Sequence, residues 1–298
     1  MTIDAIGAIL LIPVAAAAAL ALLPGYWIAA RLNVLACAAT FAAALSLFFG
    51  RPQAGPYLLV DDLNHVFIVL TTFVGFTTSV FSASYIGHEI EIGRLTPTFL
   101  RFYHAMYQVL MFAMNLALMA NNIGVMWVAI ELATLTTVLM VGIYRTHEAL
   151  EAAWKYFILG SVGIALALFG TILVYMAARP VLGEGLTAMI WTQLIGATQN
   201  FDPALLNLAF VFLLLGYGTK VGLAPLHAWL PDAHAEGPTP ISAVLSGLLL
   251  NVALYALLRF KMILAANAFA LAPGPLMVLL GLISLVFASF MLYRRRDI

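Results

Sequence analysis

Long apolar runs alternate with short polar breaks along almost the whole chain. We find nine such runs, each near the length of about 20 residues with which an α-helix crosses the hydrocarbon core of a bilayer. The breaks contain proline, glycine, asparagine and arginine, most of which are typical of turns and loops. The pattern predicts an all-α, polytopic membrane protein of about nine transmembrane helices, over residues 3–23, 27–49, 64–86, 104–120, 123–144, 149–177, 204–229, 241–260 and 275–293.

The composition agrees with this class. Hydrophobic residues make up 64% of the 298 residues and charged residues 9%, whereas soluble domains hold about 45–50% and about 25%. The formal net charge is zero, so nothing in it indicates nucleic acid or a polybasic membrane-surface partner. The single cysteine, Cys37, excludes an intrachain disulfide framework. We expect it to pack as a small buried hydrophobe.

Helix ends and basic residues predict the topology. Thr146, followed by Glu148 and Glu151, is typical of a capped start for the sixth helix. No Lys or Arg precedes the first run, and we expect a retained span rather than a signal peptide. Six basic residues against four favour one side as cytoplasmic, with the amino terminus outside. The six are Arg94, Arg101, Arg145, Arg294, Arg295 and Arg296, and the four are Arg51, Arg179, Arg259 and Lys261.

Three ionisable side chains lie inside apolar runs or at their mouths. Glu131 lies in the fifth run, Lys220 in the seventh, and Lys155 near the start of the sixth. A charged side chain at the bilayer centre costs about 2.5–3.5 kcal/mol or more, and such residues commonly mark ion or proton pathways. We therefore expect the chain to move charge, most simply protons.

Some of these residues also have a structural interpretation. Lys155 follows Glu151 by four residues, in the order that favours a helical ion pair. Structural pairing and a place in the proton path both stay open for Lys155. We expect four histidines at predicted helix ends to be interfacial rather than functional: His65, His88, His104 and His147.

The seventh run contains a helix break. Pro225 has no N–H to donate to the Val221 carbonyl, so the helix must kink or break there. Freed backbone groups are tolerated in a membrane only inside protein or beside water, and broken helices near charges build many transporter ion sites. Lys220 and His227 lie seven residues apart, about two turns of an unbroken helix, and would then face one path. We expect a following loop to cap this path at the cytoplasmic end, with Asp232, His234 and Glu236.

Several stretches carry a family resemblance. WVAIEL surrounds Glu131, EAAWKYFILGS contains Lys155, and GYGTKVGLAPLHAWLPDAHAEGPTPISAVLSG contains Lys220. Together they resemble the antiporter-like subunits of complex I, of Mrp-type cation/proton antiporters and of membrane-bound hydrogenases. The stretches DDLNHVFIVLTTFVGFTTSVFSASYI, from 61 to 86, and RFYHAMYQ, from 101 to 108, look most like component F of the hydrogenase-4 group, which is related to formate hydrogenlyase.

The resemblance implies a proton-translocating membrane subunit, with Glu131 as the carboxylate of the key pair and Lys220 as the central proton-carrying lysine. In some relatives a lysine at the position of Lys155 completes or adjoins the pair. We place His227 beyond the break in the same path. The family fold has two inverted five-helix repeats. The chain would then hold an N-terminal three-helix segment (1–102), the complete first repeat (103–262) and the start of the second (263–298).

Two features depart from the family pattern. Several relatives carry a lysine or histidine in the eighth helix, where this chain has Asn251, an amide that orients water but holds no proton at neutral pH. We expect the relay beyond Lys220 to use waters, Tyr255 one turn further on, or another route. The chain also stops where relatives continue into the second repeat, so we expect a truncated form.

Three functions stay open at this point. The first is a proton-translocating subunit of a hydrogenase-4 or complex I-like redox complex in the cell inner membrane, with membrane, nickel–iron hydrogenase and iron–sulfur subunits as partners. The second is a membrane scaffold that conducts nothing, and the third is a sodium/proton antiporter subunit. The sequence has no Cys cluster for iron–sulfur centres, no spaced Cys/His zinc set and no phosphate-binding glycine loop. We expect no metal, cofactor or redox chemistry in the chain itself.

Overall fold

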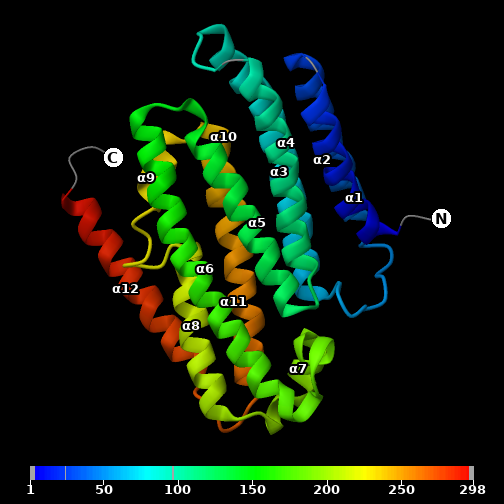
Figure 1. The fold of residues 1–298 in the computed structure, drawn as a ribbon, viewed down its shortest axis with the longest axis vertical. Helices are drawn as coiled ribbons and strands as arrows, with labels where there is room; N and C mark the ends of the chain where they lie inside the picture. The colour runs from blue at the N-terminus through cyan, green and yellow to red at the C-terminus, as the bar shows by residue number, and fades with distance from the viewer. Residues whose placement is uncertain (1–3, 24, 96, 295–298) are drawn as a thin grey trace. The chain divides into compact units, whose positions relative to one another are not determined.

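The computed structural model describes residues 4–23, 25–95 and 97–294, which form helices joined by short connections (Figure 1). The long helices are α1 Ala5–Leu22, α2 Tyr26–Ser46, α3 Asp62–Glu91, α4 Pro97–Met119, α5 Ile123–Val141, α6 His147–Leu182, α8 Pro203–Val221, α11 Leu250–Ala265 and α12 Pro273–Arg294. The short helical segments are η1 Gly142–Tyr144, η2 Gly185–Met189, α7 Trp191–Ala197, η3 Thr198–Asn200, α9 Leu230–Glu236, α10 Thr239–Val244 and the π-helical η4 Leu245–Leu249.

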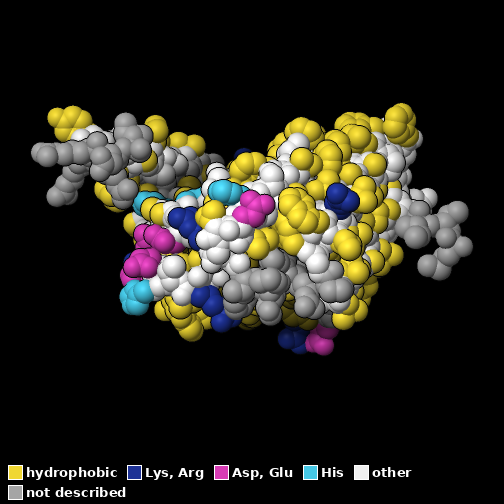
Figure 2. Space-filling model, turned by 90° about the horizontal axis from the view of Figure 1, so that it is seen from above, with side chains coloured by type: hydrophobic (Ala, Val, Ile, Leu, Met, Phe, Trp, Pro, Cys, Tyr) yellow, Lys and Arg dark blue, Asp and Glu magenta, His cyan; other side chains and the backbone are white. Residues whose placement is uncertain are grey.

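The predicted membrane class is confirmed. Within the described residues, eight helical segments are long and apolar enough to span a membrane. They match eight of the nine predicted runs, and the remaining run, 104–120, falls in the 23-residue helix α4. Figure 2 shows hydrophobic side chains over much of the view from above, with most of the visible Lys, Arg, Asp, Glu and His side chains gathered toward its left.

Some predicted boundaries were wrong. Helix α4 begins seven residues before position 104, and α6 continues past Pro180 to Leu182. A proline so close to a helix end removes only one backbone hydrogen bond from the last turn. The helix predicted over 204–229 already ends at Val221. The seven-residue helix α7 was not predicted.

The described chain forms two compact units. The first comprises Met1–Phe157 with Asp232–Val252, and the second comprises Ile158–Pro231 with Ala253–Ile298. Helices α6 and α11 each begin in the first unit and end in the second.

In the first unit, helices α1 to α5 pack beside one another. Contacts join α1 to α2 and α4, α2 to α3 and α4, and α4 to α5 (Figure 1). A cluster of small and apolar side chains lies between α1, α2 and α4, and consists of Ala16, Leu20, Ala29, Ala36 and Ala105. Small residues let transmembrane helices approach closely, which increases their van der Waals contact.

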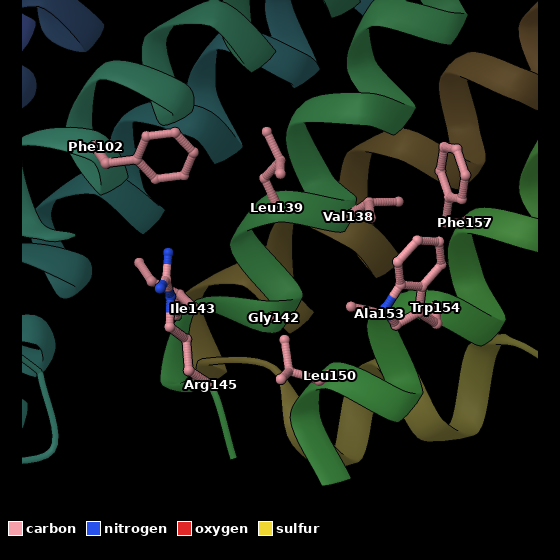
Figure 3. A pocket seen from close by; sticks show the side chains of 10 residues that line it. All are labelled: Phe102, Val138, Leu139, Gly142, Ile143, Arg145, Leu150, Ala153, Trp154 and Phe157. Atoms are coloured by element: carbon pink, nitrogen blue, oxygen red, sulfur yellow. The ribbon is translucent and has the colours of Figure 1, made fainter. Parts of the chain in front are cut away.

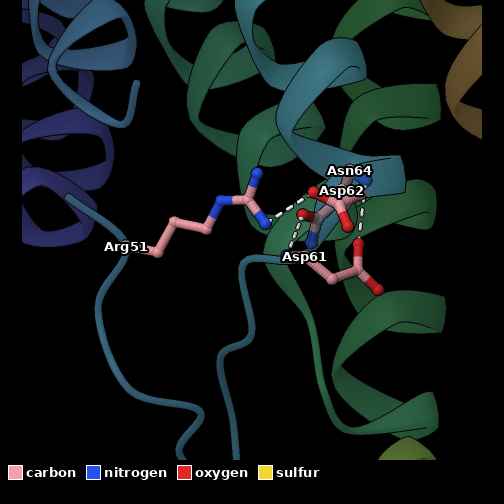
Figure 4. A network of polar contacts seen from close by, with 4 residues as sticks. All are labelled: Arg51, Asp61, Asp62 and Asn64. Atoms are coloured by element: carbon pink, nitrogen blue, oxygen red, sulfur yellow. Dashed lines mark hydrogen bonds and ion pairs between the residues drawn. The ribbon is translucent and has the colours of Figure 1, made fainter. Parts of the chain in front are cut away.

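The start of α3 is held by its own side chains (Figure 4). The Asp61 carboxylate accepts from the Asn64 N–H at 2.9 Å, and the Asn64 side chain accepts from the Asp61 N–H at 2.7 Å. This capping box satisfies two backbone donors at once. Asn64 Nδ2 also donates to the carbonyls of Leu59 and Leu118. Arg51 pairs with Asp62 at 2.6 Å, outside the box.

The next helix starts follow the same chemistry. Asn122 Oδ1 accepts from the N–H groups of Gly124 and Val125 at the start of α5. Thr146 Oγ1 accepts from the Ala149 N–H at 3.1 Å, which confirms the predicted cap of α6.

In the second unit, glycines let α6 and α8 approach closely. A Cβ atom on Gly216 would lie 2.5 Å from the Ala167 nitrogen and 2.6 Å from the Gly163 carbonyl oxygen. On α6, a Cβ on Gly170 would meet the Leu213 side chain at 2.6 Å. Only a residue without Cβ fits this contact. The close contact fixes α8 one turn before Lys220.

Candidate proton-transfer site

Lys220 is completely buried at the end of α8. Asp202 Oδ1 caps the helix start by accepting from the Ala204 N–H, and Pro203 occupies the first turn. Lys220 is 0% exposed and is the second-last residue of the helix. A lysine is almost never fully buried unless it is paired, because its ammonium group loses hydration.

The helix break after Lys220 is confirmed, but it begins before Pro225. Gly222 adopts φ +83° and its N–H donates to the Gly218 carbonyl, as does the N–H of Leu223. These bonds end the helix in a left-handed glycine turn. Residues 222–229 are not helical, and helix structure resumes at Leu230 in α9.

Side chains satisfy backbone groups that the break frees. Trp229, completely buried, donates its Nε1–H to the Thr219 carbonyl at 2.9 Å. The Ala224 N–H donates to Ser284 Oγ of α12, also at 2.9 Å. The break is therefore a specific, hydrogen-bonded structure rather than a frayed helix end.

His227 lies inside this non-helical segment. Its ring centroid lies 5.1 Å from that of Phe287, in an edge-on arrangement. Its Nδ1 atom is buried and has no hydrogen-bond partner among the described residues. The two-turn spacing considered for Lys220 and His227 does not apply, because the helix is broken between them.

Glu131 lies at the middle of α5 in the first unit. Its side chain is half-buried, and its Oε2 atom is hidden from solvent. One turn further on, the buried Thr134 hydroxyl donates to the Ile130 carbonyl. The Thr137 hydroxyl contacts that of Tyr156 at 2.7 Å, which links α5 to α6.

Lys155 connects two carboxylates. Its Nζ atom lies 2.8 Å from Glu151 Oε1 and 2.9 Å from Asp232 Oδ2. The Glu151 pair confirms the structural interpretation from the sequence. The Asp232 pair was not predicted, because it joins residues 77 positions apart. Lys155 is half-exposed, with 48% of its side chain accessible.

The segment expected to be a capping loop is a helix instead. Asp232, His234 and Glu236 all lie on α9. The His234 carbonyl accepts from the Ser242 hydroxyl at 3.0 Å, which joins α9 to α10. Burial lowers the pKa of His234 below its ordinary value of 6.5.

Asn251 and Tyr255 both lie on α11, and the side chain of each makes a hydrogen bond. Asn251 Nδ2 donates to the Gly247 carbonyl at 2.6 Å, inside the π-helical turn η4. Such turns leave carbonyls without their usual helical donor. The Tyr255 hydroxyl accepts from Arg259 Nε at 2.7 Å.

Arg259 is a functional candidate that sequence reasoning missed. It was counted among the basic residues that set topology, but it is only 2% exposed. Its guanidinium lies 4.3 Å from the Trp191 ring centroid, and the Trp191 Nε1–H donates to the Arg259 carbonyl. Arg259 is therefore an interior cation. Its place inside the predicted apolar run 241–260, one turn after Tyr255, was the available signal.

A pocket of about 660 Å³ lies elsewhere in the first unit, where η1 and the start of α6 meet (Figure 3). Leu139, Trp154 and Phe157 give it a mainly apolar lining, and Arg145 lies at one side. No carboxylate, imidazole, thiol or hydroxyl is among the residues that line it.

The predicted site residues fall in both units. Glu131, Lys155 and Asn251 belong to the first unit, whereas Lys220, Pro225, His227 and Tyr255 belong to the second. In the first unit the structure brings Lys155 to Asp232. In the second unit, Lys220 lies at the end of α8, and the non-helical segment 222–229 follows it.

A discontinuous apolar helix with a buried lysine, within an all-α membrane fold, defines an antiporter-like membrane subunit. Residues 120–298 match the family described as NADH:quinone oxidoreductase/Mrp antiporter, transmembrane, and the chain belongs to this family. It is 62% identical over 291 residues to a hydrogenase-4 component F homolog from Methylacidiphilum infernorum (isolate V4). The alignment covers 98% of this chain and 61% of that protein. The resemblance to component F is thereby confirmed.

More distant relatives point to the same fold. The chain is 34% identical over 191 residues to NAD(P)H-quinone oxidoreductase chain 4 of Gloeobacter violaceus, covering 61% of this chain and 35% of that one. A chain of respiratory complex I from Thermus thermophilus superposes with a TM-score of 0.76 at 26% identity, over 97% of this chain and 59% of that chain. The chain thus spans about three fifths of the length of its component F relative.

Proposed function

We propose that this chain is a proton-translocating membrane subunit of a hydrogenase-4 or complex I-like redox complex. The observation that carries the proposal is Lys220, buried to 0% exposure at the end of α8, directly before the break over 222–229. Ionisable residues inside transmembrane bundles are rare and belong to ion and proton pathways. Discontinuous helices place such residues beside backbone groups that also bind ions or water.

In this mechanism Lys220 accepts and releases a proton, and Glu131 is the carboxylate that acts with it. His227, whose Nδ1 has no partner among the described residues, carries the proton into the non-helical segment. Lys155 has a different part in the proposal, because Glu151 and Asp232 already hold its amine. It anchors α9, the helix that follows the break.

The chain by itself does not supply the energy. A unit charge that moves about 10 Å from a site changes its energy by roughly 1.7 kcal/mol, at an effective dielectric constant of about 20. This is a little over one pKa unit, enough to bias loading of a lysine but not to drive protons against a large gradient. We therefore place the driving reaction in partner subunits that carry a nickel–iron centre and iron–sulfur clusters, in the cell inner membrane.

The experiment is proton uptake by inverted membrane vesicles that hold the assembled complex and are energised by its electron donor. Glu131→Gln keeps the shape of the side chain but removes its charge, so we expect proton uptake to fall strongly while electron transfer continues. Unchanged uptake in this variant would contradict the proposal. Proton flux that requires sodium in the medium would instead indicate a sodium/proton antiporter subunit. Absence of any ion uptake in the wild type, with intact assembly, would favour the non-conducting scaffold.

A further inference from the structure

Helices α2, α3 and α4 enclose a column of polar side chains that the proton path does not use. Its members come from all three helices, and each is 0% exposed. They are Asn33 of α2, Ser82 of α3, and Tyr103, His104, Gln108 and Asn115 of α4. His104 was expected at the membrane–water interface. It is instead fully buried, because α4 begins at Pro97, seven residues before it.

Protein contacts satisfy only part of this column. The hydroxyls of Ser82 and Tyr103 meet at 2.6 Å. Gln108 Nε2 donates to Asn33 Oδ1 at 2.9 Å and approaches Cys37 Sγ at 3.2 Å. Among the described residues, buried atoms of the same column have no hydrogen-bond partner: Asn33 Nδ2, both ring nitrogens of His104, Gln108 Oε1 and Asn115 Oδ1.

So many unmet polar groups on neighbouring helices require an explanation. Lipid offers no hydrogen bonds, and an unsatisfied polar group inside a membrane protein is strongly unfavourable. Buried polar groups that lack a protein partner are commonly bonded to internal water, which needs two to four such partners. The amides of Asn33 and Gln108 and the imidazole of His104 provide such partners along one interface.

An apolar cluster within one helical turn of the column gives the contrast. Ala29 and Ala36 of α2, four residues before and three residues after Asn33, belong to this cluster with Ala16, Leu20 and Ala105. None of these five side chains has a polar atom, so they offer no hydrogen bond to water. The buried groups that need a partner therefore belong to the column and not to this cluster.

The column starts at one end of α2 and reaches the middle of the membrane. The half-buried Tyr26, first residue of α2, donates its hydroxyl to the Ala83 carbonyl, and its ring centroid lies 5.6 Å from that of His104. Cys37 lies eleven residues further along α2, about 16 Å at the helical rise. This is about half of the roughly 30 Å hydrocarbon thickness.

We propose that the α2–α3–α4 interface holds a chain of internal waters, an inlet that runs from Tyr26 past His104 to Asn33, Gln108 and Cys37. His104 is its ionisable group and can exchange protons with these waters. The presence of the inlet is independent of the proposed function, and only the use of its protons in translocation rests on that function.

Cys37 tests the inlet directly, because it is the only cysteine in the chain and lies at the inner end. The full chain in liposomes is treated with silver nitrate in chloride-free buffer. Ag⁺ is close to a water molecule in size, and it replaces the thiol proton, which leaves to water. After removal of excess silver, the chain is denatured and alkylated with a maleimide polymer. We expect silver to prevent most of the alkylation of Cys37.

The matched control is Ala16→Cys in a Cys37→Ser background. Ala16 is 7% exposed and lies in the apolar cluster, on α1, which contributes no side chain to the column. We expect silver to leave the cysteine at position 16 open to alkylation. Where this variant fails to fold, Leu20→Cys, at a 0% exposed position of α1 in the same cluster, takes its place. His104→Phe, which removes the imidazole and fills its space, should slow silver protection of Cys37, whereas His104→Gln should preserve it.

Each result of the silver assay either supports the inlet or overturns it. Protection of Cys37 with none at the control position supports the inlet. No protection of Cys37, with full alkylation after denaturation, overturns it. Equal protection at both positions also overturns it, because it shows general opening of the bundle. Since the assay measures a thiol and not ion transport, failure of the proton function in vesicles leaves this test unaffected.

Discussion

Lys155 Nζ lies 2.9 Å from Asp232 Oδ2, so a side chain of α6 holds the helix that follows the α8 break. Glu151 shares the same amine from one turn earlier on α6, at 2.8 Å. The Glu151 contact joins residues of one helix and restrains nothing else. The Asp232 contact joins separate elements, and we infer that it positions α9.

We predict different effects from removal of the two carboxylates. Asp232→Asn should reduce proton uptake in energised vesicles, because α9 loses its anchor to α6. Glu151→Gln should leave uptake near the wild-type level, since the amine keeps Asp232. The electron-transfer rate, measured in parallel, controls for assembly. Equal effects of the two substitutions on uptake would show that the Asp232 contact has no positioning role.

The close contact of α6 and α8 gives a prediction about stability. Gly216→Ala places a Cβ 2.5 Å from the Ala167 backbone nitrogen, where no flexible side chain can move aside. Overpacking of this kind costs about 1–3 kcal/mol and sometimes more. We expect a lower thermal unfolding midpoint of the detergent-solubilised chain. Gly281→Ala is the control, because its Cβ would meet nothing within 4 Å. Equal midpoints for the two variants would mean that the helices do not meet at Gly216.

The network at the start of α3 separates a buried cap from an exposed ion pair. Asn64→Ala removes bonds to Asp61, Leu59 and Leu118, and loss of buried hydrogen bonds costs about 1–3 kcal/mol. Arg51→Gln breaks a pair whose side chains are 47% and 89% exposed, and such pairs contribute less than about 1 kcal/mol. Thermal unfolding should show the larger decrease for Asn64→Ala. The reverse order would contradict the geometry in Figure 4.

His234 predicts a pH dependence. Burial lowers its pKa below 6.5 in the folded chain, so the unfolded chain binds more protons once the pH falls below about 6.5. The stabilising effect of the neutral imidazole is complete above that value and is lost as the pH falls below it. His234→Gln should remove part of this decrease, whereas His147→Gln, at an exposed position of α6, serves as the control. An identical acid loss in wild type and His234→Gln would exclude the histidine as its source.

The spans were predictable because hydrophobic periodicity and length act locally. Thr146 and the pair of Glu151 with Lys155 were predictable for the same reason, since each interaction lies within one helical turn. The family resemblance also depends on contiguous motifs, and the component F relative confirms it at 62% identity.

Other features depend on residues that are distant in sequence. Asp232 meets Lys155 across 77 positions, and no local pattern indicates that contact. Pro225 marked the break, but Gly222 ends the helix first, by adopting φ +83°. His104 was assigned to an interface because the polar residues of α4 interrupted its apolar pattern and hid its first turns. Burial of Arg259 against Trp191 likewise arises from tertiary packing.

The most direct measurement compares Lys220→Met with Thr219→Val in vesicles that hold the assembled complex. Both residues are buried near the end of α8, at 0% and 5% exposure, but only Lys220 can carry a proton. We predict that Lys220→Met abolishes proton uptake while electron transfer continues, and that Thr219→Val retains uptake. If vesicles with the Lys220→Met variant took up protons as fast as the wild type, this result would contradict the central claim that protons pass through this lysine.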